Sequence, residues 1–221
     1  YTNFDQKGMI PNNDLKKNTV SVNAGTDITD KLNVSSVITY VNERSNNRSK
    51  VGYGNENSGY DNPLNQFIWG GRNLDWNYLR DHYQITNPDE THTQTNWLGY
   101  YSNNPYWLLN KNTNSFRRDR YTGAITLSYK LTPWLTAQGR ILNDFYTQQI
   151  KERTAIGTWG AVQSLGGYNQ TDAKRGELNK ELLLLLNKEL SDKISIDATF
   201  GGNRRTDKVQ NNYLVGGSGI V

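Results

Sequence analysis

Alternation of apolar and polar side chains is the feature of this sequence that most constrains its fold, and it is clearest between residues 118 and 145. A period of two is typical of a β-strand with one apolar and one polar face. Thr132-Pro133 interrupts the pattern with a turn signal, and a second alternating run follows. The segment therefore predicts a β-hairpin, whose apolar side carries Tyr121, Gly123, Ile125, Leu127, Tyr129 and Leu131, then Leu135, Ala137, Gly139, Ile141 and Phe145.

Two other segments repeat this plan. Residues 17–28 and 32–44 alternate on either side of a short turn, and so do residues 177–190 and 194–200. Leu, Glu and Lys also favour helices, but the turn and the renewed alternation after residue 190 favour a strand at 177–190. The strings DITDKLNV, KLTPWLTA and ELSDKISI are three versions of one turn. The sequence thus predicts three hairpins, joined by long polar connections at 45–116 and 151–174.

Two lysines fall on the apolar side of the third hairpin. Lys188 is near the turn and is expected to extend its amine past the apolar zone, whereas Lys180 would have to reach the opposite interface. We also expect the first residues, YTNFDQKG, to be the end of a strand and a short helix to form around residues 73–81.

Hairpins of this kind suit either a soluble β-sandwich or the wall of a membrane β-barrel. The mean hydropathy is −0.82 and only 34% of the residues are hydrophobic, which is little material for a soluble core. The 14 Tyr, 6 Trp and 5 Phe argue against disorder. Tyrosines bracket the apolar zone, and short turns alternate with long loops, as in outer-membrane barrels. We therefore expect an all-β, antiparallel transmembrane β-barrel segment with long extracellular loops, in which residues 1–221 form part of one barrel domain.

Other classes of protein are disfavoured by what the sequence lacks. Without cysteine there is no disulfide framework, no thiolate metal site and no cysteine nucleophile. A net charge of +4, spread along the chain, does not indicate a nucleic-acid partner. The sequence contains no run of about 18 apolar residues, so it predicts no transmembrane helix. With no signal peptide at its start and a strand already under way, the chain is expected to be an internal piece of a longer protein.

The connection from residue 53 to 107 is the richest candidate for a site. Flat indole faces beside charged side chains suit the stacking and hydrogen bonding that sugar rings need. The same rings would also suit packing of the loop onto itself, or docking of a partner, because Trp is an interface anchor. The candidate ligand- or partner-contacting residues are Trp69, Arg72, Trp76, Trp97 and Trp107.

The remaining candidates are weaker. His82 and His92 lie in the same loop, but their spacing matches no metal-ligand pattern. The glycine-rich residues 52–59 do not complete a phosphate-binding motif. No catalytic arrangement of Ser, His and Asp is evident, so we expect no enzymatic activity, no metal and no cofactor. Arg117, Arg118 and Arg120 cluster at one strand end, where they could bind an anionic lipid or substrate, or could be ordinary rim charge.

Several segments, in order, resemble the barrel of SusC/RagA-family TonB-linked outer-membrane proteins. They are residues 8–49, NPLNQFIWGGRNLDWNYLRDHY, the NPYW of residues 104–107, and NTNSFRRDRYTGAITLSYKLTPWL. The resemblance implies a 22-stranded barrel closed by a plug domain. It further implies TonB-dependent import of glycans or peptides, with a SusD-like surface lipoprotein, across the outer membrane of a Bacteroidetes-type bacterium. The plug, the TonB-contacting region and the other strands would lie outside these residues.

Two other functions remain open from the sequence. A plug-free porin would share every strand signal. A soluble carbohydrate-binding or glycan-cleaving β-domain would use the tryptophan-rich loop instead.

Overall fold

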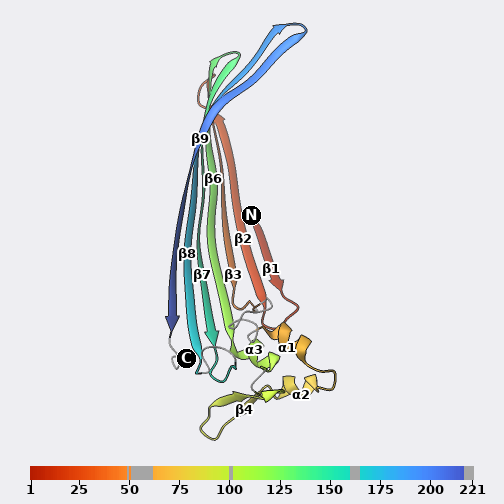
Figure 1. Cartoon of the computed structure of the whole chain (residues 1–221). Helices are drawn as coiled ribbons and strands as arrows, with labels where there is room; N and C mark the ends of the chain where they lie inside the picture. Colours follow the sequence, from red (N-terminus) through yellow and green to blue (C-terminus); the bar gives the residue numbers. More distant parts are fainter. Residues whose placement is uncertain (49, 51–61, 100–101, 160–164, 217–221) are drawn as a thin grey trace.

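The chain forms one long, seven-stranded antiparallel sheet in strand order β1-β2-β3-β6-β7-β8-β9 (Figure 1). The computed structural model describes residues 1–48, 50, 62–99, 102–159 and 165–216. Strand pairs are joined by short turns at one end of the sheet, here called the turn end, and by longer connections at the other, the loop end. The strands are β1 (Thr2–Lys7), β2 (Asp14–Asp27), β3 (Leu32–Ser45), β6 (Thr113–Thr132), β7 (Leu135–Thr154), β8 (Gly167–Ser191) and β9 (Ile194–Gly216).

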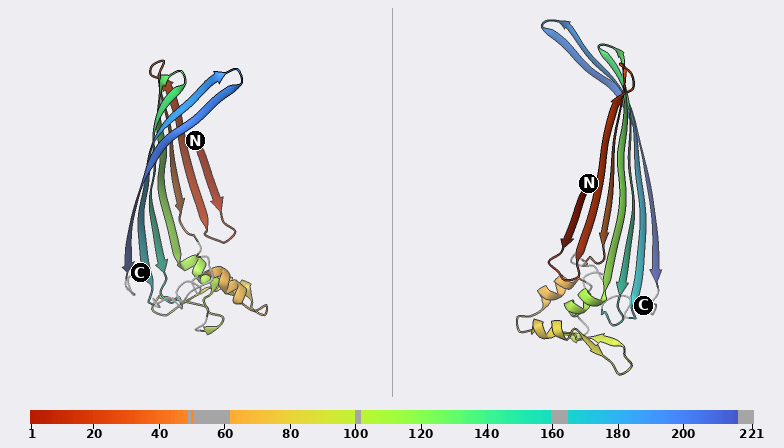
Figure 2. Two further views of the ribbon diagram at one scale, coloured as in Figure 1. Left: turned by 45° about the horizontal axis from the view of Figure 1, so that its top comes forward. Right: turned by 180° about the vertical axis from the view of Figure 1, so that it is seen from behind.

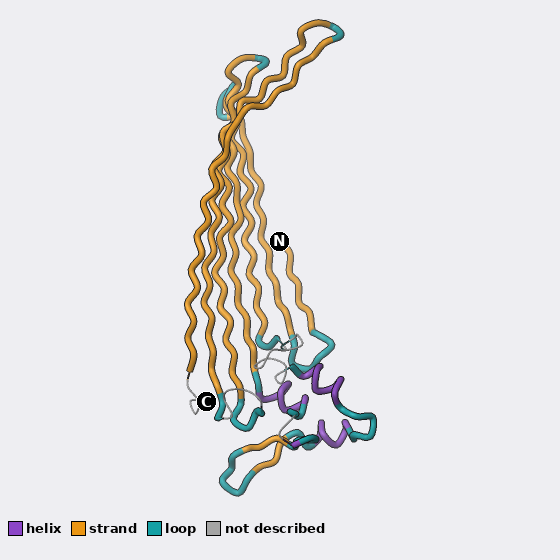
Figure 3. Tube along the Cα trace, viewed as in Figure 1, coloured by secondary structure: helices purple, strands orange, loops and turns teal. Residues whose placement is uncertain are grey.

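All three predicted hairpins are present, and so is the predicted strand at the start of the chain, β1. The strand interpretation of residues 177–190 is confirmed, because they lie within β8. The strands are longer than predicted, however, and the second long connection spans only 155–166 rather than 151–174. Towards the loop end polar residues occupy most positions of both faces, so the alternation fades while the strands continue (Figure 3).

The cross-strand register places the predicted apolar residues on a single face, here called the outer face. Ile38 lies directly opposite Val22, and Ile125 opposite Ile141, and directly opposed residues share a face. These side chains are open rather than packed: Val22 is 60% exposed and Ile125 51%. Within the described residues no second sheet or helix layer covers them. The other face, here called the inner face, carries the polar set.

The turns are stepped across the sheet. Leu32 at the start of β3 is opposite Tyr129, and β6 runs three residues further, to Thr132. Leu135 at the start of β7 is opposite Leu186, and β8 runs five residues further, to Ser191. Each hairpin therefore extends beyond the one before it, a stagger typical of strands that tilt around a barrel.

Aromatic side chains mark both ends of the apolar zone on the outer face. On the loop-end side Tyr40 stacks on Tyr121, with ring centroids 4.7 Å apart. On the turn-end side Lys188 lies over the ring of Trp134, its Nζ 5.0 Å from the centroid. From Tyr121 to the end of β6 is eleven residues, or about 36 Å of strand and about 28 Å of height at a barrel tilt near 40°. That height is close to the apolar band of an outer-membrane barrel, about 25 Å.

The stagger also accounts for the two lysines on the outer face. Lys180 is eleven residues from the end of β8, the same distance that separates Tyr121 from the end of β6. Lys180 is therefore level with the loop-end aromatic residues, and Lys188 with those at the turn end. Both amines lie at the edges of the apolar zone, as predicted for side chains that must reach water.

The first long connection folds into a compact unit at the loop end, here called the cap (residues 62–99 and 102–112; Figures 1 and 2). The helix expected around residues 73–81 begins at Trp76, because the Asp75 side chain caps it by accepting from Tyr78 N. The glycine-rich residues 52–59 lie outside the described residues. No helix in the described part of the chain is long and apolar enough to cross a membrane. The cap contains α1 (Pro63–Trp69), α2 (Trp76–Asp81), β4 (Gln84–Thr86), β5 (His92–Gln94) and α3 (Pro105–Lys111).

Candidate functional site

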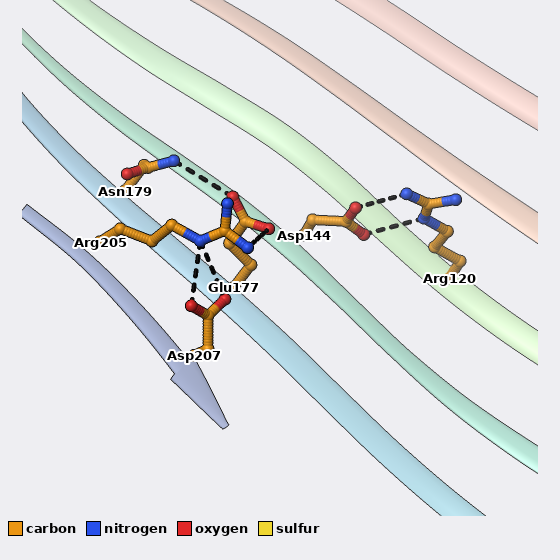
Figure 4. A network of polar contacts seen from close by, with 6 residues as sticks. All are labelled: Arg120, Asp144, Glu177, Asn179, Arg205 and Asp207. Atoms are coloured by element: carbon orange, nitrogen blue, oxygen red, sulfur yellow. Dashed lines mark hydrogen bonds and ion pairs between the residues drawn. The ribbon is translucent and has the colours of Figure 1, made fainter. Parts of the chain in front are cut away.

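Charged side chains on the inner face form two adjacent groups, which meet where Asp144 lies directly opposite Glu177 (Figure 4). Arg120 on β6 donates from Nε to Asp144 on β7 at 2.8 Å. Glu177 and Asp207 lie directly opposite each other on β8 and β9. Arg205 bridges these two carboxylates, with nitrogen–oxygen distances of 3.0 Å to each. Like charges on opposed residues repel, and the guanidinium between them offsets that repulsion.

Ion pairs continue along the inner face in both directions, with Arg140 and Glu181 on the turn-end side of this group and Glu43 on its loop-end side. Arg140 forms an ion pair with Glu181 at 2.8 Å. Glu43 forms ion pairs with both Arg118 and Lys17. These side chains are partly exposed, so each pair contributes little to stability by itself. Most ion pairs of the described residues lie on the inner face, and the outer-face pairs Arg117–Asp119 and Lys16–Asp5 lie beyond the apolar zone, towards the loop end.

An open hollow of about 660 Å³ lies on this inner face near the cap. Phe116, 8% exposed, forms part of its wall. The guanidinium of Arg48 lies 4.0 Å from the Phe116 ring centroid, and that of Arg118 lies 5.7 Å from it. Cations over an aromatic face are attracted by the ring, so Phe116 holds both guanidinium groups at the hollow. Strand β6 positions two of the three residues, and Arg48, three residues after the end of β3, is held beside them by a backbone hydrogen bond of 2.8 Å from its N to the Asn114 oxygen.

Arg48 is the guanidinium of this hollow that forms no ion pair within the described residues, and Glu152 and Glu43 act on it only at longer range. Its Nε is buried and has no hydrogen-bond partner in the described part of the chain, where no carboxylate lies within ion-pair distance of it either. The two carboxylates of the hollow are occupied: Glu43 by Arg118 and Lys17, and Asp14 by backbone and side-chain groups of residues 45–47. Burial, and then the nearby Arg118, lower the pKa of the Arg48 guanidinium. An anionic group that entered the hollow could form an ion pair with the Arg48 guanidinium.

Buried amide side chains hold the cap together. Asn104 is fully buried, caps α3 through Tyr106 N, and donates to the carbonyl oxygens of Leu79 and Thr95. Asn103 accepts from Gln94 Nε2 at 2.7 Å and from Trp159 N at 2.8 Å. The cap is thereby tied to the connection between β7 and β8. Buried polar groups of this kind specify one arrangement, since each must keep its partners.

The structure separates the five predicted site residues. Trp107 is 1% exposed and donates from Nε1 to Thr158 Oγ1 at 3.0 Å, so it packs the cap internally. Trp76 is half-buried against Phe67, with ring centroids 5.2 Å apart. Trp97 is half-buried, and its Nε1 lacks a partner in the described residues. Trp69, the last residue of α1, is 58% exposed, and Arg72 is exposed in the link between α1 and α2. The surface-facing residues of the set are therefore Trp69 and Arg72.

The weaker candidates have local partners. His82 stacks on Tyr78 with centroids 4.4 Å apart, and a ring nitrogen of His92 is 3.3 Å from the Thr86 hydroxyl. No group of three potential metal ligands occurs among the described residues. Hydrogen bonds from Thr91 lower the pKa of Asp89.

The three-arginine cluster does not act as one unit. Arg117 lies directly opposite Gln149 on the outer face, whereas Arg118 and Arg120 lie on the inner face. The period of two already implied this division. The sequence carried no comparable signal for Arg48 and Phe116, because 68 residues separate them in the chain and only the β3–β6 pairing brings them together.

Seven long antiparallel strands with one apolar and one charged face form the wall of a β-barrel. The solved structure of the RagAB peptide importer in the "closed-closed" state is similar to this chain, with a TM-score of 0.63 and 15% sequence identity. The match covers 98% of this chain and 23% of the other, so this chain spans less than a quarter of the matched chain's length. At this identity the likeness shows a shared fold. No protein-family model matches the chain, and no curated protein matches it.

Proposed function

We propose that this chain is part of the barrel of a SusC/RagA-like, TonB-dependent importer in the outer membrane of a Bacteroidetes-type bacterium. The observation that carries the proposal is the two-sided wall, whose apolar face is open and whose other face carries ion pairs between neighbouring strands. The fold match to an importer that takes up peptides supports the same assignment. A wall of this kind needs lipid on one side and water on the other.

In this proposal the cap and the inner hollow meet the imported molecule. Arg48, available and held over Phe116, suits a carboxylate beside an apolar group, and peptides carry both. Trp69 and Arg72 on the cap surface suit a partner, here a SusD-like lipoprotein that would close over the loop end. The proposal assigns the chain a transport role, with no catalytic residue, metal or cofactor.

Membrane insertion is the first test. The full-length protein should fractionate with the outer membrane, require detergent for extraction, and migrate faster on gels when left unheated. A soluble carbohydrate-binding domain would purify without detergent, and that outcome would overturn the proposal. The open outer face, with Leu182 64% exposed, already argues against a soluble body.

Transport itself is the second test. Uptake of labelled peptides by cells should require both the TonB system and the SusD-like partner, and that partner should co-purify with the importer. A plug-free porin would instead show steady ion conductance in a planar bilayer and uptake independent of TonB.

A further inference from the structure

The outer face carries a group of basic side chains beside the apolar zone, on β8 and β9. We define the outer basic patch as Lys174, Lys180, Arg204 and Lys208. Lys180 and Arg204 lie directly opposite each other, and Gly176 lies opposite Lys208. All four side chains are exposed, and none has a hydrogen bond or ion pair to another described residue. Asp172, two positions from Lys174 on the same face, is the one carboxylate of the described residues beside the patch, and Lys180, Arg204 and Lys208 have none next to them.

The pairing of Lys180 with Arg204 is unfavourable unless an anion offsets it. Like charges directly opposite on antiparallel strands destabilise a sheet. The inner face of the same two strands shows how such a pair is otherwise accommodated: Glu177 and Asp207 are opposed there, and Arg205 bridges them. On the outer face, the described positions around Lys180 and Arg204 hold no carboxylate: they are Ile141, Leu178, Leu182, Gly202 and Thr206.

The height of the patch on the outer face indicates which anion could offset its charge. Lys180 is directly opposite Ile141 and level with the loop-end aromatic residues, so it lies where the apolar zone ends. Arg204 is ten residues into β9, as Phe145 is into β7, and Lys174 and Lys208 lie further towards the loop end. A membrane that covers the apolar face would place its phosphate groups at this height.

We infer that the outer basic patch binds the phosphate groups of an anionic membrane lipid in the leaflet at the loop end. This inference rests on the proposed membrane location of the barrel. The bound phosphate lies between Lys180 and Arg204 and accepts charge-assisted hydrogen bonds from both, with Lys208 next along the same strand. The lipid phosphate thus offsets the repulsion between two opposed like charges, as Arg205 does for Glu177 and Asp207 on the inner face.

The test uses the full-length importer, purified in neutral detergent and given mixed micelles of phosphatidylglycerol or phosphatidylcholine. Lipid retained by the protein is measured by native mass spectrometry. The wild type should retain phosphatidylglycerol preferentially. Lys180→Gln with Arg204→Gln should reduce that preference about thirtyfold, because each basic side chain at an anionic membrane surface contributes about a fivefold factor. The matched control is Arg175→Gln with Lys130→Gln, which removes the same charge from the inner face and should leave the preference unchanged.

A charge swap gives a second readout. Lys180→Glu places a carboxylate opposite Arg204, so the variant should be more heat-stable than the wild type without lipid and should gain no stability from phosphatidylglycerol. Equal lipid preference in the wild type and the double variant would overturn the inference. So would full competition by inorganic phosphate, since the site would then bind a free anion. If the protein inserts normally but shows no lipid preference, only this inference fails; if it does not enter membranes, the proposed function fails with it.

Discussion

The hydroxyl of Tyr40 on β3 donates a 2.6 Å hydrogen bond to Oδ1 of Asp119 on β6. This contact lies on the outer face, at the border between its apolar zone and the polar zone towards the loop end. The Tyr40 ring stacks on Tyr121 at the end of the apolar zone, and Asp119 is the first residue of the polar zone on β6. Arg117 donates to the same carboxylate at 3.1 Å. The ring is thus suited to the lipid side of an interface and its hydroxyl to the wet side.

Removing the Tyr40 hydroxyl tests how much its hydrogen bond to Asp119 contributes to stability at the border of the apolar zone. Tyr40→Phe keeps the ring stack but leaves Asp119 with one partner fewer, so the free energy of unfolding should fall by about 1–3 kcal/mol. Urea unfolding of the full-length protein from lipid vesicles would measure it. Tyr129→Phe is the control, because that tyrosine is on the same face and its hydroxyl has no hydrogen bond to a described residue; its effect should stay within about 0.5 kcal/mol. Equal losses in the two variants would contradict the border assignment.

Lysine substitutions on the two faces of β6 test which face of the sheet contacts lipid. Ile125→Lys places a charge near the middle of the outer apolar zone and should cost about 2–4 kcal/mol of folding stability in a bilayer. Thr122→Lys, on the inner face of the same strand and directly opposite Asp144, should be tolerated. The fraction of each variant that assembles into vesicles, followed by heat-dependent gel mobility, is the measurement. Equal assembly of both variants would show that the two faces are wrongly assigned.

The cap offers a test of burial against surface contact. Trp107→Ala removes a buried ring and its hydrogen bond to Thr158, and should destabilise the cap by about 3–5 kcal/mol. Hydrogen exchange at residues 62–112 should then speed up while the strands stay protected. Trp69→Ala should leave cap exchange unchanged but weaken binding of the SusD-like partner. Unchanged exchange in the Trp107 variant would mean that the cap does not depend on this ring.

Arg48 offers a test of ligand chemistry. Arg48→Gln should weaken binding of a peptide with a free C-terminal carboxylate about tenfold or more, because hydrogen bonds to charged groups contribute about 1.5–3 kcal/mol. The same peptide with an amidated C-terminus should bind both proteins alike. Arg44→Gln removes an equal charge from the outer face of β3 and serves as the control in the same calorimetric titration. A loss of affinity for both peptides would assign Arg48 a structural role instead.

The sequence by itself determined which residues share a face. In a strand the side-chain direction follows directly from the period of two, so Ile125 and Ile141, or Leu184 and Phe200, could be assigned without knowing their neighbours. Local turn chemistry likewise located the three hairpins. The strand ends were harder to predict, because the alternation disappears where both faces are polar.

Only the tertiary structure decided which partners meet. The pairing of β3 with β6 brings Arg48 to Phe116, and the folding of the cap buries Trp107 while it leaves Trp69 at the surface. The register of β8 and β9 gives Glu177 and Asp207 a bridging arginine and leaves Lys180 and Arg204 without a carboxylate. Such contacts join residues that are distant in the chain, and their geometry depends on strand register and stagger, which no local preference of the residues involved specifies.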